Sequence, residues 1–288
     1  MSDDEVLLSH DDGRGVRTLT LNRPHRKNAL DDALWRALRD ALAAAGEDRE
    51  VRALVITGAG GAFCSGADIS GGPRTEHPTY RMRMLSDVAL TLHELPVPTV
   101  AKVTGVAVGA GWNLALGCDL VVATPSARFS QIFTRRGLSL DLGGSWLLPR
   151  LVGLQQAKRL ALLAETLDAE QARTLNLVTW VVPESEVDAF TDGVCDRLVG
   201  GPPVALAQSK ALLNEGVDRT LRDALANEAR AQGVNFATRD ATEAFAAFAQ
   251  RRDPHFTGTW AVPPSLTDMN GSARSPGPGH EERLRQAD

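Results

Sequence analysis

The chain has 288 residues, of which 31 are Lys or Arg and 36 are Asp or Glu, so its formal net charge is −5. This acidic balance excludes a protein that binds nucleic acid or another polyanion through a general basic surface. With 43% hydrophobic and 23% charged residues, the chain can bury a sizeable core, which excludes wholesale disorder and predicts either two domains or one large one.

In the first part of the chain, β-prone runs alternate with amphipathic segments. Strands are expected at residues 16–21, 51–57, 99–103 and 120–123. Helices are expected between the capping residue Asp31 and Gly46, and then at 79–95 and 112–116. Strands that alternate with helices of this length predict an α/β core with crossover connections.

From about Leu154 the pattern becomes mainly helical. Helices are expected at residues 154–163, 169–174, 186–199, 203–213 and 220–249, with one short strand at 178–182. They predict a helical subdomain, which either covers the first half of the chain or forms a subunit interface. Residues 261–288 contain four prolines and little apolar material, so they are expected to form a flexible tail.

Two glycine-rich loops, residues 58–68 and 105–111, each lie between a β-prone run and a helix. Small residues let a substrate oxygen approach the main chain, and a helix that starts near Ala110 adds unpaired N–H donors and the positive end of its dipole. Two N–H groups from separate loops could therefore make an oxyanion hole. The alternative is that the glycines only permit tight turns and close packing.

Motif spacing disfavours several other reaction classes. Gly58 and Gly60 follow a β-prone run, but Phe63 stands where a dinucleotide-binding fingerprint has its third glycine. The sequence has no GxxxxGK[ST] phosphate-binding loop, and neither Ser65 nor Ser145 lies in the GxSxG frame of a nucleophilic serine. Phosphoryl transfer and serine hydrolysis are therefore not expected.

The cysteines and the amino terminus indicate the compartment. Cys64, Cys118 and Cys195 are far apart and form no CxxC pair or Cys/His cluster, so neither a disulfide framework nor a zinc site is predicted. The first ten residues include three acidic side chains and lack the basic and apolar segments of a secretory signal. No uncharged apolar stretch reaches the roughly 18 residues of a membrane span, so we expect a soluble, cytoplasmic protein without a membrane partner.

Five motifs follow one another along the chain. They are LNRP at 21–24 with NAL at 28–30, AFCSGADI at 62–69, GVAVGAG at 105–111 followed by CD at 118–119, GGSWLLPR at 143–150, and FTG at 256–258. In this order they resemble the motifs of the crotonase, or enoyl-CoA hydratase/isomerase, superfamily. The resemblance implies an α/β fold with a crotonase-like spiral of ββα units in residues 1–200 and a helical trimerisation subdomain in residues 201–260. It also implies a homotrimer or a dimer of trimers.

By the same resemblance, the substrate is an acyl-CoA thioester. The backbone N–H groups of Ala67 and Ala110 would hold its thioester oxygen, in agreement with the interpretation of the two loops as an oxyanion hole. Coenzyme A is then part of the substrate, so no separate cofactor and no metal ion are implied.

Further contacts to the substrate are implied by the matching positions of the family. Main-chain groups of Ser65, Asp68 and Ile69 would contact the adenine and pantetheine, and Gly66 and Gly109 would also belong to the substrate-binding site. The basic residues His25, Arg26 and Lys27 lie where basic residues often meet the phosphates of coenzyme A, although a basic trio on the surface is more often only solvated. Arg135 and Arg136 are expected to be solvated.

Hydratases of this family commonly use two carboxylates, and this sequence departs from that pattern. Asn113 stands at the first of the two positions and Phe133 at the second. An amide cannot act as a carboxylate base, and a phenyl ring cannot exchange protons. Both side chains are expected beside the substrate, but ordinary hydratase activity is not expected.

Asp141 resembles the aspartate that some enoyl-CoA and dienoyl-CoA isomerases of the family place beside the acyl chain. One carboxylate is sufficient for isomerisation, because it can take a proton from one carbon and return it to another. The neighbouring residues Leu138, Leu140 and Leu142 predict a raised pKa for this carboxyl group. The alternative is that Asp141 caps a helix that starts near Gly143.

We therefore expect an acyl-CoA enzyme that shifts the double bond of an enoyl-CoA through a dienolate, with Asp141 as proton shuttle. One alternative is a hydratase that uses Asp141 together with Asn113 as an unusual water-positioning group. Another is a non-catalytic acyl-CoA-binding protein that keeps the oxyanion hole. Proton exchange at the acyl carbons would separate an enzyme from a pure binder.

Overall fold

A computed structural model describes residues 5–70 and 77–261 of the chain. The chain divides into two compact units, residues 1–231 and residues 232–288. The expected division at residue 200 stays a prediction. The tail expected at residues 261–288 lies outside the described residues, apart from Ala261.

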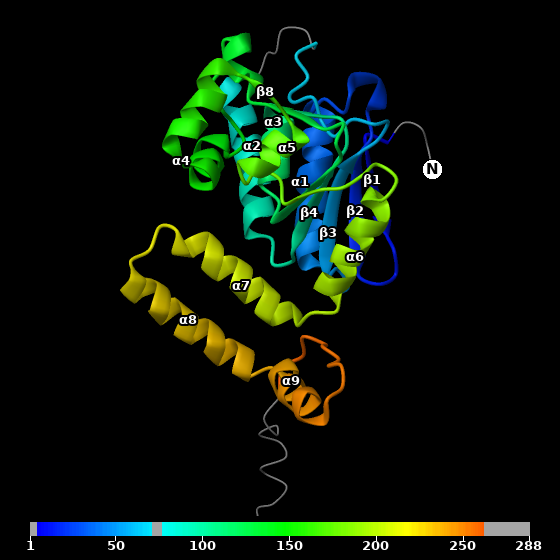
Figure 1. The fold of residues 1–288 in the computed structure, drawn as a ribbon, viewed down its shortest axis with the longest axis vertical. Coiled ribbons are helices and arrows are strands. Elements are labelled where there is room, and N and C mark those ends of the chain that lie inside the picture. Colours follow the sequence, from blue (N-terminus) through cyan, green and yellow to red (C-terminus); the bar gives the residue numbers. More distant parts are fainter. Residues whose placement is uncertain (1–4, 71–76, 262–288) are drawn as a thin grey trace, which may run out of the picture. The chain divides into compact units, whose positions relative to one another are not determined.

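The first unit is built on a six-stranded sheet in the order β1-β2-β3-β4-β6-β9 (Figure 1). Its strands are β1 (Leu7–Asp11), β2 (Val16–Leu21), β3 (Ala53–Gly58), β4 (Thr99–Val103), β6 (Leu120–Ala123) and β9 (Trp180–Val181). β1 runs antiparallel to β2, and all other neighbouring pairs are parallel. The four strands expected in the first part of the chain are confirmed, and β1 was not expected.

The sheet separates two clusters of apolar side chains. Leu54 and Ile56 of β3 pack with helices α1 (Asp32–Glu47), α2 (Pro78–Glu94) and α3 (Ala110–Leu116) on one face. Val55, between them in the sequence, packs with α6 (Val187–Val199) on the other face, in front of the sheet in Figure 1. Successive side chains of a strand point to opposite faces, so a sheet covered on both sides needs the uninterrupted apolar run of β3.

The helices that cover the sheet begin where the sequence signals predict. The carboxylate of Asp31 accepts a hydrogen bond from the Leu34 N–H at 2.9 Å and caps α1. Leu34, Leu38 and Leu42 of this helix are fully buried, as their four-residue spacing predicts. α2 and α3 lie close to the ranges expected for them.

A second sheet joins three strands of three residues each, β5 (Val106–Val108), β7 (Arg128–Ser130) and β8 (Thr166–Asp168). β5 and β7 are parallel, whereas β7 and β8 are antiparallel. None of these strands was expected, because three residues are too few to show an alternating pattern. The glycine-rich segment 105–111, which was expected to be a loop, thus contains strand β5, the capping residue Gly109 and the start of α3.

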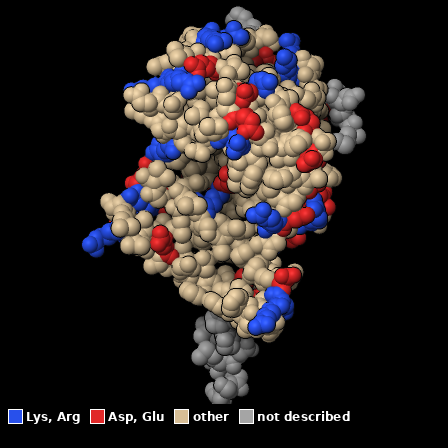
Figure 2. Space-filling model, viewed as in Figure 1, with Lys and Arg blue, Asp and Glu red and all other residues tan. Residues whose placement is uncertain are grey.

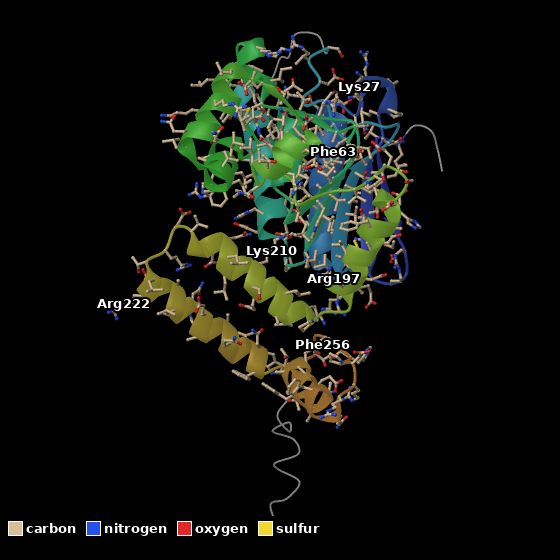
Figure 3. The ribbon with its side chains drawn as sticks, in the orientation of Figure 1. Lys27, Phe63, Arg197, Lys210, Arg222 and Phe256 are labelled. Atoms are coloured by element: carbon tan, nitrogen blue, oxygen red, sulfur yellow. The ribbon has the colours of Figure 1, made fainter. Side chains whose placement is uncertain are left out.

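The remaining elements of the first unit are mostly helical. They are the short 3-10 helices η1 (Pro24–Arg26) and η2 (Ile132–Arg136), α4 (Gly144–Leu163), α5 (Ala169–Thr174), α7 (Pro203–Gly216) and the first part of α8 (Leu221–Phe236). Within the first unit, Lys210 of α7, labelled in Figure 3, pairs with Asp119 at 2.9 Å. α4 contains a break at Gly153, where φ is 74°. It starts ten residues before the expected helix 154–163, because the segment before Gly153 is helical as well.

The prediction of a single helix at 220–249 is wrong. The chain leaves the helical conformation after Phe236, and α9 (Arg239–Gln250) begins with Thr238 as its capping residue, whose hydroxyl accepts from the Ala241 N–H. Within the second unit, the carboxylate of Asp240 accepts hydrogen bonds from the N–H groups of Thr257 and Gly258, both at 2.8 Å. This contact explains the FTG motif, because it closes the chain back onto the start of α9.

Positive and negative side chains are interspersed over the face drawn in Figure 2, as the near balance of charges predicts. The three cysteines are buried thiols without a disulfide. None of the helices in the described ranges has the length and apolarity needed to cross a bilayer.

Candidate active site

The loop after β3 is tied to the segment before α1 by Asn28. This residue is fully buried and adopts a left-handed conformation, with φ of 56°. Its Nδ2 donates to the main-chain oxygens of Ala59 and Ala62 at 2.9 and 2.7 Å, and its Oδ1 accepts from the Arg23 N–H at 2.9 Å. The NAL motif therefore shapes the first glycine-rich loop from outside that loop.

Ala67 lies on an extended stretch of the same loop, in a parallel bridge with Leu30. The Leu30 N–H donates to Gly66, and the Asp68 N–H donates to Leu30, at 2.8 and 3.0 Å. Because alternate residues of an extended chain turn their polar groups to opposite sides, Ala67 turns its own N–H away from Leu30.

The second loop is bound to the first by main-chain hydrogen bonds. The Cys64 N–H donates to Val106, and the Val108 N–H donates to Cys64, both at 2.9 Å. Gly66 has φ of 92°, and a Cβ at this position would lie 2.8 Å from the Val108 oxygen. Only glycine permits both this conformation and this close approach of the two loops.

Ala110 is the first residue of α3, directly after Gly109. In the described part of the chain, no main-chain or side-chain acceptor takes the N–H of Ala110 or the N–H of Ala67. The Ala110 N–H would lie 3.7 Å from a Cβ at Gly66, so the two loops bring these two donors into one region. Unpaired donors at a helix start, next to a second free N–H, can hold a developing negative charge on oxygen.

A cavity of about 350 Å³ opens where the two loops meet. Its lining contains every site residue expected from the sequence except Asn113, namely Arg26, Ser65, Gly66, Ala67, Asp68, Ile69, Gly109, Ala110, Phe133 and Asp141. Residues that were not expected to bind the substrate complete the wall, among them Val108, Ile132, Arg136 and Leu138. Segments far apart in the sequence therefore form one site.

Asp141 is a half-buried carboxyl group in this lining. Its Oδ1 is inaccessible to solvent and has no hydrogen-bond partner among the described residues. Burial raises the pKa of Asp141 to about 6, although the positive charge of Arg81 acts in the opposite direction. The capping alternative is wrong, because α4 is capped by Gly143 without any side-chain hydrogen bond.

Asp68 is the other carboxylate in the cavity wall, and its pKa is shifted in the opposite direction to that of Asp141. It accepts hydrogen bonds from the Ser70 hydroxyl at 2.6 Å and the Ser70 N–H at 2.9 Å, and it pairs with Arg23 at 3.0 Å. These hydrogen bonds and the Arg23 charge lower the pKa of Asp68 to about 2. Asp68 therefore stays ionised at neutral pH and orders the loop.

Asn113 is fully buried and absent from the cavity wall. Its Nδ2 donates to the main-chain oxygen of Asp141 at 2.9 Å, and its Oδ1 accepts from Gln131 Nε2 at 2.8 Å. Both ends of the amide are thus engaged with protein groups behind Asp141. The structure does not bring Asn113 to the cavity, in contrast to the expectation from the sequence.

Phe133 fills the wall next to Gly109, where a Cβ would lie 3.6 Å from the phenyl ring. Phe133 belongs to η2, which also carries Arg136 into the cavity lining. Arg26, at the end of η1, is the other cation of the lining, and both arginines are exposed. Lys27, labelled beside η1 in Figure 3, is exposed and outside the lining.

The sequence did not reveal the place of Arg136. A 3-10 turn of five residues has no periodic pattern, so nothing in the sequence marks which of its side chains faces a cavity. Ser65 is placed by two contacts, a hydrogen bond of its N–H to Lys27 at 2.9 Å and one of its hydroxyl to Arg26 at 3.1 Å. Ile69 is largely exposed at the edge.

Comparison with known proteins agrees with this fold. The family model of enoyl-CoA hydratase/isomerase matches residues 11–259. The chain belongs to this family, its fold is the crotonase fold, and it is an enzyme of the enoyl-CoA hydratase/isomerase class.

Two curated relatives carry different names. The chain is 39% identical to a Rhodobacter capsulatus protein named "Probable enoyl-CoA hydratase", over 87% of this chain and 98% of the relative. It is 37% identical to the 1,2-epoxyphenylacetyl-CoA isomerase of Escherichia coli (strain K12), over 88% of this chain and 99% of the relative. A crystal structure of an enoyl-CoA hydratase from Mycobacterium smegmatis superimposes with a TM-score of 0.83 at 35% identity, over 88% of this chain and 99% of that one. Relatives of similar identity therefore carry hydratase and isomerase names.

No group of three or more His, Cys, Asp or Glu side chains within residues 5–70 and 77–261 is placed to hold a metal ion. The thiol of Cys64, at the junction of the loops, has its pKa raised by burial to about 12, so it stays protonated.

Proposed function

We propose that this protein isomerises enoyl-CoA thioesters by moving their double bond through a dienolate, with Asp141 as the proton shuttle. The observation that carries the proposal is the contrast between the two carboxylates of the cavity. Ion pairing and hydrogen bonds hold the pKa of Asp68 at about 2, whereas burial raises that of Asp141 to about 6. A carboxyl group with a pKa near the working pH can both accept and return a proton.

The main-chain donors supply the second part of the proposed reaction. With the thioester oxygen between the N–H groups of Ala67 and Ala110, negative charge that develops on this oxygen would be stabilised by about 3 kcal/mol per donor. The ionised Asp141 takes a proton from one carbon of the acyl group, which leaves a dienolate held by the two donors. The protonated Asp141 then returns the proton to another carbon, and the double bond has moved.

The rim of the cavity suits coenzyme A. Arg26 and Arg136 supply two exposed positive charges in the lining, and both are available for phosphate oxygens. Ile132, Phe133 and Leu138 make part of the wall apolar, as an acyl group requires. No separate cofactor enters the proposed reaction, because coenzyme A is part of the substrate.

The position of Asn113 favours isomerisation over hydration. Asn113 is buried behind Asp141 and does not line the cavity, so its amide is not placed to hold a water molecule there. The E. coli relative named as an isomerase supports the proposal, and the relatives named as hydratases keep hydration as the alternative reaction. A homotrimer or a dimer of trimers, and a cytoplasmic location, stay predictions.

The test is incubation of the purified protein in D₂O with 2-enoyl-CoA and 3-enoyl-CoA, following double-bond position, hydration and deuterium uptake together. Migration with deuterium at the α- or γ-carbon and no 3-hydroxyacyl product is expected. A 3-hydroxyacyl-CoA product would show a hydratase instead. Acyl-CoA binding without any proton exchange would show a non-catalytic binder.

A further inference from the structure

The turn that carries Asp141 has an unusual backbone. Leu142 has φ of 45° and Gly143 has φ of 77°, and α4 starts at the next residue. A leucine in the left-handed region is uncommon, because its Cβ crowds the main chain there. Such a conformation persists only where surrounding contacts hold it.

The main-chain oxygen of Asp141 receives two of these contacts. It accepts a hydrogen bond from the Gly144 N–H at 2.9 Å, within the turn, and one from Asn113 Nδ2 at 2.9 Å, from helix α3. The second contact connects the turn to a helix that also presents the Ala110 N–H. Asp141 and the Ala110 N–H, which is one of the two proposed oxyanion donors, are therefore both connected to helix α3.

Gln131 contacts the other end of the Asn113 amide. The main-chain oxygen of Asp141 can only accept, so it takes Asn113 Nδ2, and Asn113 Oδ1 accepts from Gln131 Nε2 at 2.8 Å. Both amides are buried, and Gln131 follows directly on strand β7. The side chains of Gln131 and Asn113, here called the relay, thus connect the end of β7 to the Asp141 turn through two hydrogen bonds.

Gly144 makes room for this relay. A Cβ at residue 144 would lie 2.3 Å from Asn113 Nδ2 and 2.8 Å from Asn113 Oδ1. Neither distance is compatible with a side chain at this position unless the amide moves. Glycine at residue 144 and asparagine at residue 113 are therefore fitted to each other.

We infer that Asn113 is a positioning residue, which acts with Gln131 to hold the Asp141 turn so that the carboxylate faces the cavity. This inference rests on the proposed role of Asp141 in proton transfer. Asn113 is absent from the cavity lining and lines a separate apolar cavity of about 320 Å³ with Leu142, Gly143 and Trp146. It therefore acts through Asp141 and does not contact the reacting atoms.

The test compares Asn113→Leu and Gln131→Leu with Ser130→Ala as a matched control. Ser130 is the buried neighbour of Gln131, and its hydroxyl donates to Ala164 at 3.2 Å, away from Asp141. Its replacement also removes one buried hydrogen bond, so it reports a general loss of packing. Thermal unfolding of all three variants identifies any that fail to fold.

The relay variants are expected to lower kcat about tenfold to a hundredfold, since a displaced catalytic group loses rate steeply with distance. KM and the Kd for acyl-CoA should change by less than about threefold, and the acid limb of the kcat–pH profile should shift. Ser130→Ala should keep the kcat and the profile of the unchanged protein. Equal losses of kcat in all three variants would overturn the inference, because they would indicate only a structural role.

Crystal structures of Asn113→Leu and Gln131→Leu give a readout that does not depend on the reaction. A displaced Asp141 carboxylate is expected, and an unmoved turn at residues 141–143 would overturn the inference. Asp141→Asn separates a failure of the proposed function from a failure of this inference. If that variant keeps full turnover, Asp141 is not the proton shuttle, whatever holds its turn. If Asp141→Asn is inactive while the relay variants keep wild-type kcat, only the positioning role is wrong.

Discussion

Gly66 and Val108 approach each other so closely that a Cβ on Gly66 would lie 2.8 Å from the Val108 carbonyl oxygen. Gly66 lies in the loop after β3, whereas Val108 is the last residue of β5, and each lies within two residues of an unpaired N–H, that of Ala67 or that of Ala110. The spacing of the two donors therefore depends on the absence of a single methyl group.

Gly66→Ala is expected to separate the loops and weaken the oxyanion hole. The expected loss is about a hundredfold in kcat/KM, comparable to removing one oxyanion donor, together with about 1 to 3 kcal/mol of stability from backbone strain. Steady-state kinetics and chemical denaturation measure the two effects. Gly61→Ala is the control, because Gly61 also has a positive φ of 77° but a Cβ there meets no atom within 4 Å. Equal kinetic losses in both variants would contradict the assignment of the loops.

Asp141→Asn is expected to lower turnover by about 10²- to 10⁴-fold, the usual contribution of a general acid–base group, because an amide cannot exchange the proton. Binding of acyl-CoA should change little, since the main-chain donors and the arginines remain. Single-turnover kinetics and calorimetry measure the two quantities. Undiminished turnover would exclude Asp141 as the proton shuttle.

The first proton transfer requires ionised Asp141, so kcat should fall as the pH is lowered through about 6, the raised pKa of this group. Asp68, with a pKa of about 2, should not contribute in this range. A pH–rate profile between pH 4.5 and 8.5 shows the limb, and any residual activity of Asp141→Asn should lack it. A flat profile for the unchanged protein would be inconsistent with the proposed base.

The same raised pKa predicts a cost in stability. Since folding raises the pKa of Asp141 from 3.8 to about 6, the folded state binds more protons between these values, and stability falls as the pH rises through this window. Asp141→Asn removes this cost, so the variant should be more stable than the unchanged protein at pH 8 by about 1 to 2 kcal/mol, allowing for partial solvent exposure. Below about pH 4 the difference should vanish. Urea unfolding at pH 4 and pH 8 measures it, and a variant less stable at pH 8 would show that another contact of the carboxylate dominates.

Arg26→Ala and Arg136→Ala are each expected to raise KM for a CoA thioester about threefold to tenfold, because each removes one charge-assisted contact to phosphate. The KM for the matching N-acetylcysteamine thioester, which has no phosphates, should not change. Arg135→Ala is the control, since Arg135 is the exposed neighbour of Arg136 but does not line the cavity. A rise in KM for the truncated thioester would point to contacts with the acyl group instead.

The long strands and the helices that pack on them could be predicted because each has its own periodic pattern. The break between α8 and α9 could not, since the alanine-rich pattern continues across residues 237 and 238. It depends on Thr238 as a cap and on the contact of Asp240 with Thr257 and Gly258, 17 and 18 residues away. β5 was missed for a similar reason, because its partner strand and the bridge from Cys64 define it more than its own three residues do.

For the site, the glycine-rich loops could be assigned from composition and position, and Asp141 only with the help of the family resemblance. The direction of the Asn113 side chain could not be predicted, because it depends on Gln131, on a turn with two left-handed residues and on the missing side chain of Gly144. The family resemblance placed Asn113 beside the substrate, whereas its hydrogen bonds place it behind Asp141.

The two apolar clusters lie on opposite faces of the sheet, and only one of them contains residues next to the cavity. The valines that face α6, among them Val55, Val100 and Val122, share no cluster with Phe63, Cys64, Ala107 or Ala110 next to the cavity. Substitutions in that valine layer are therefore expected to affect the stability of the sheet more than the geometry of the cavity.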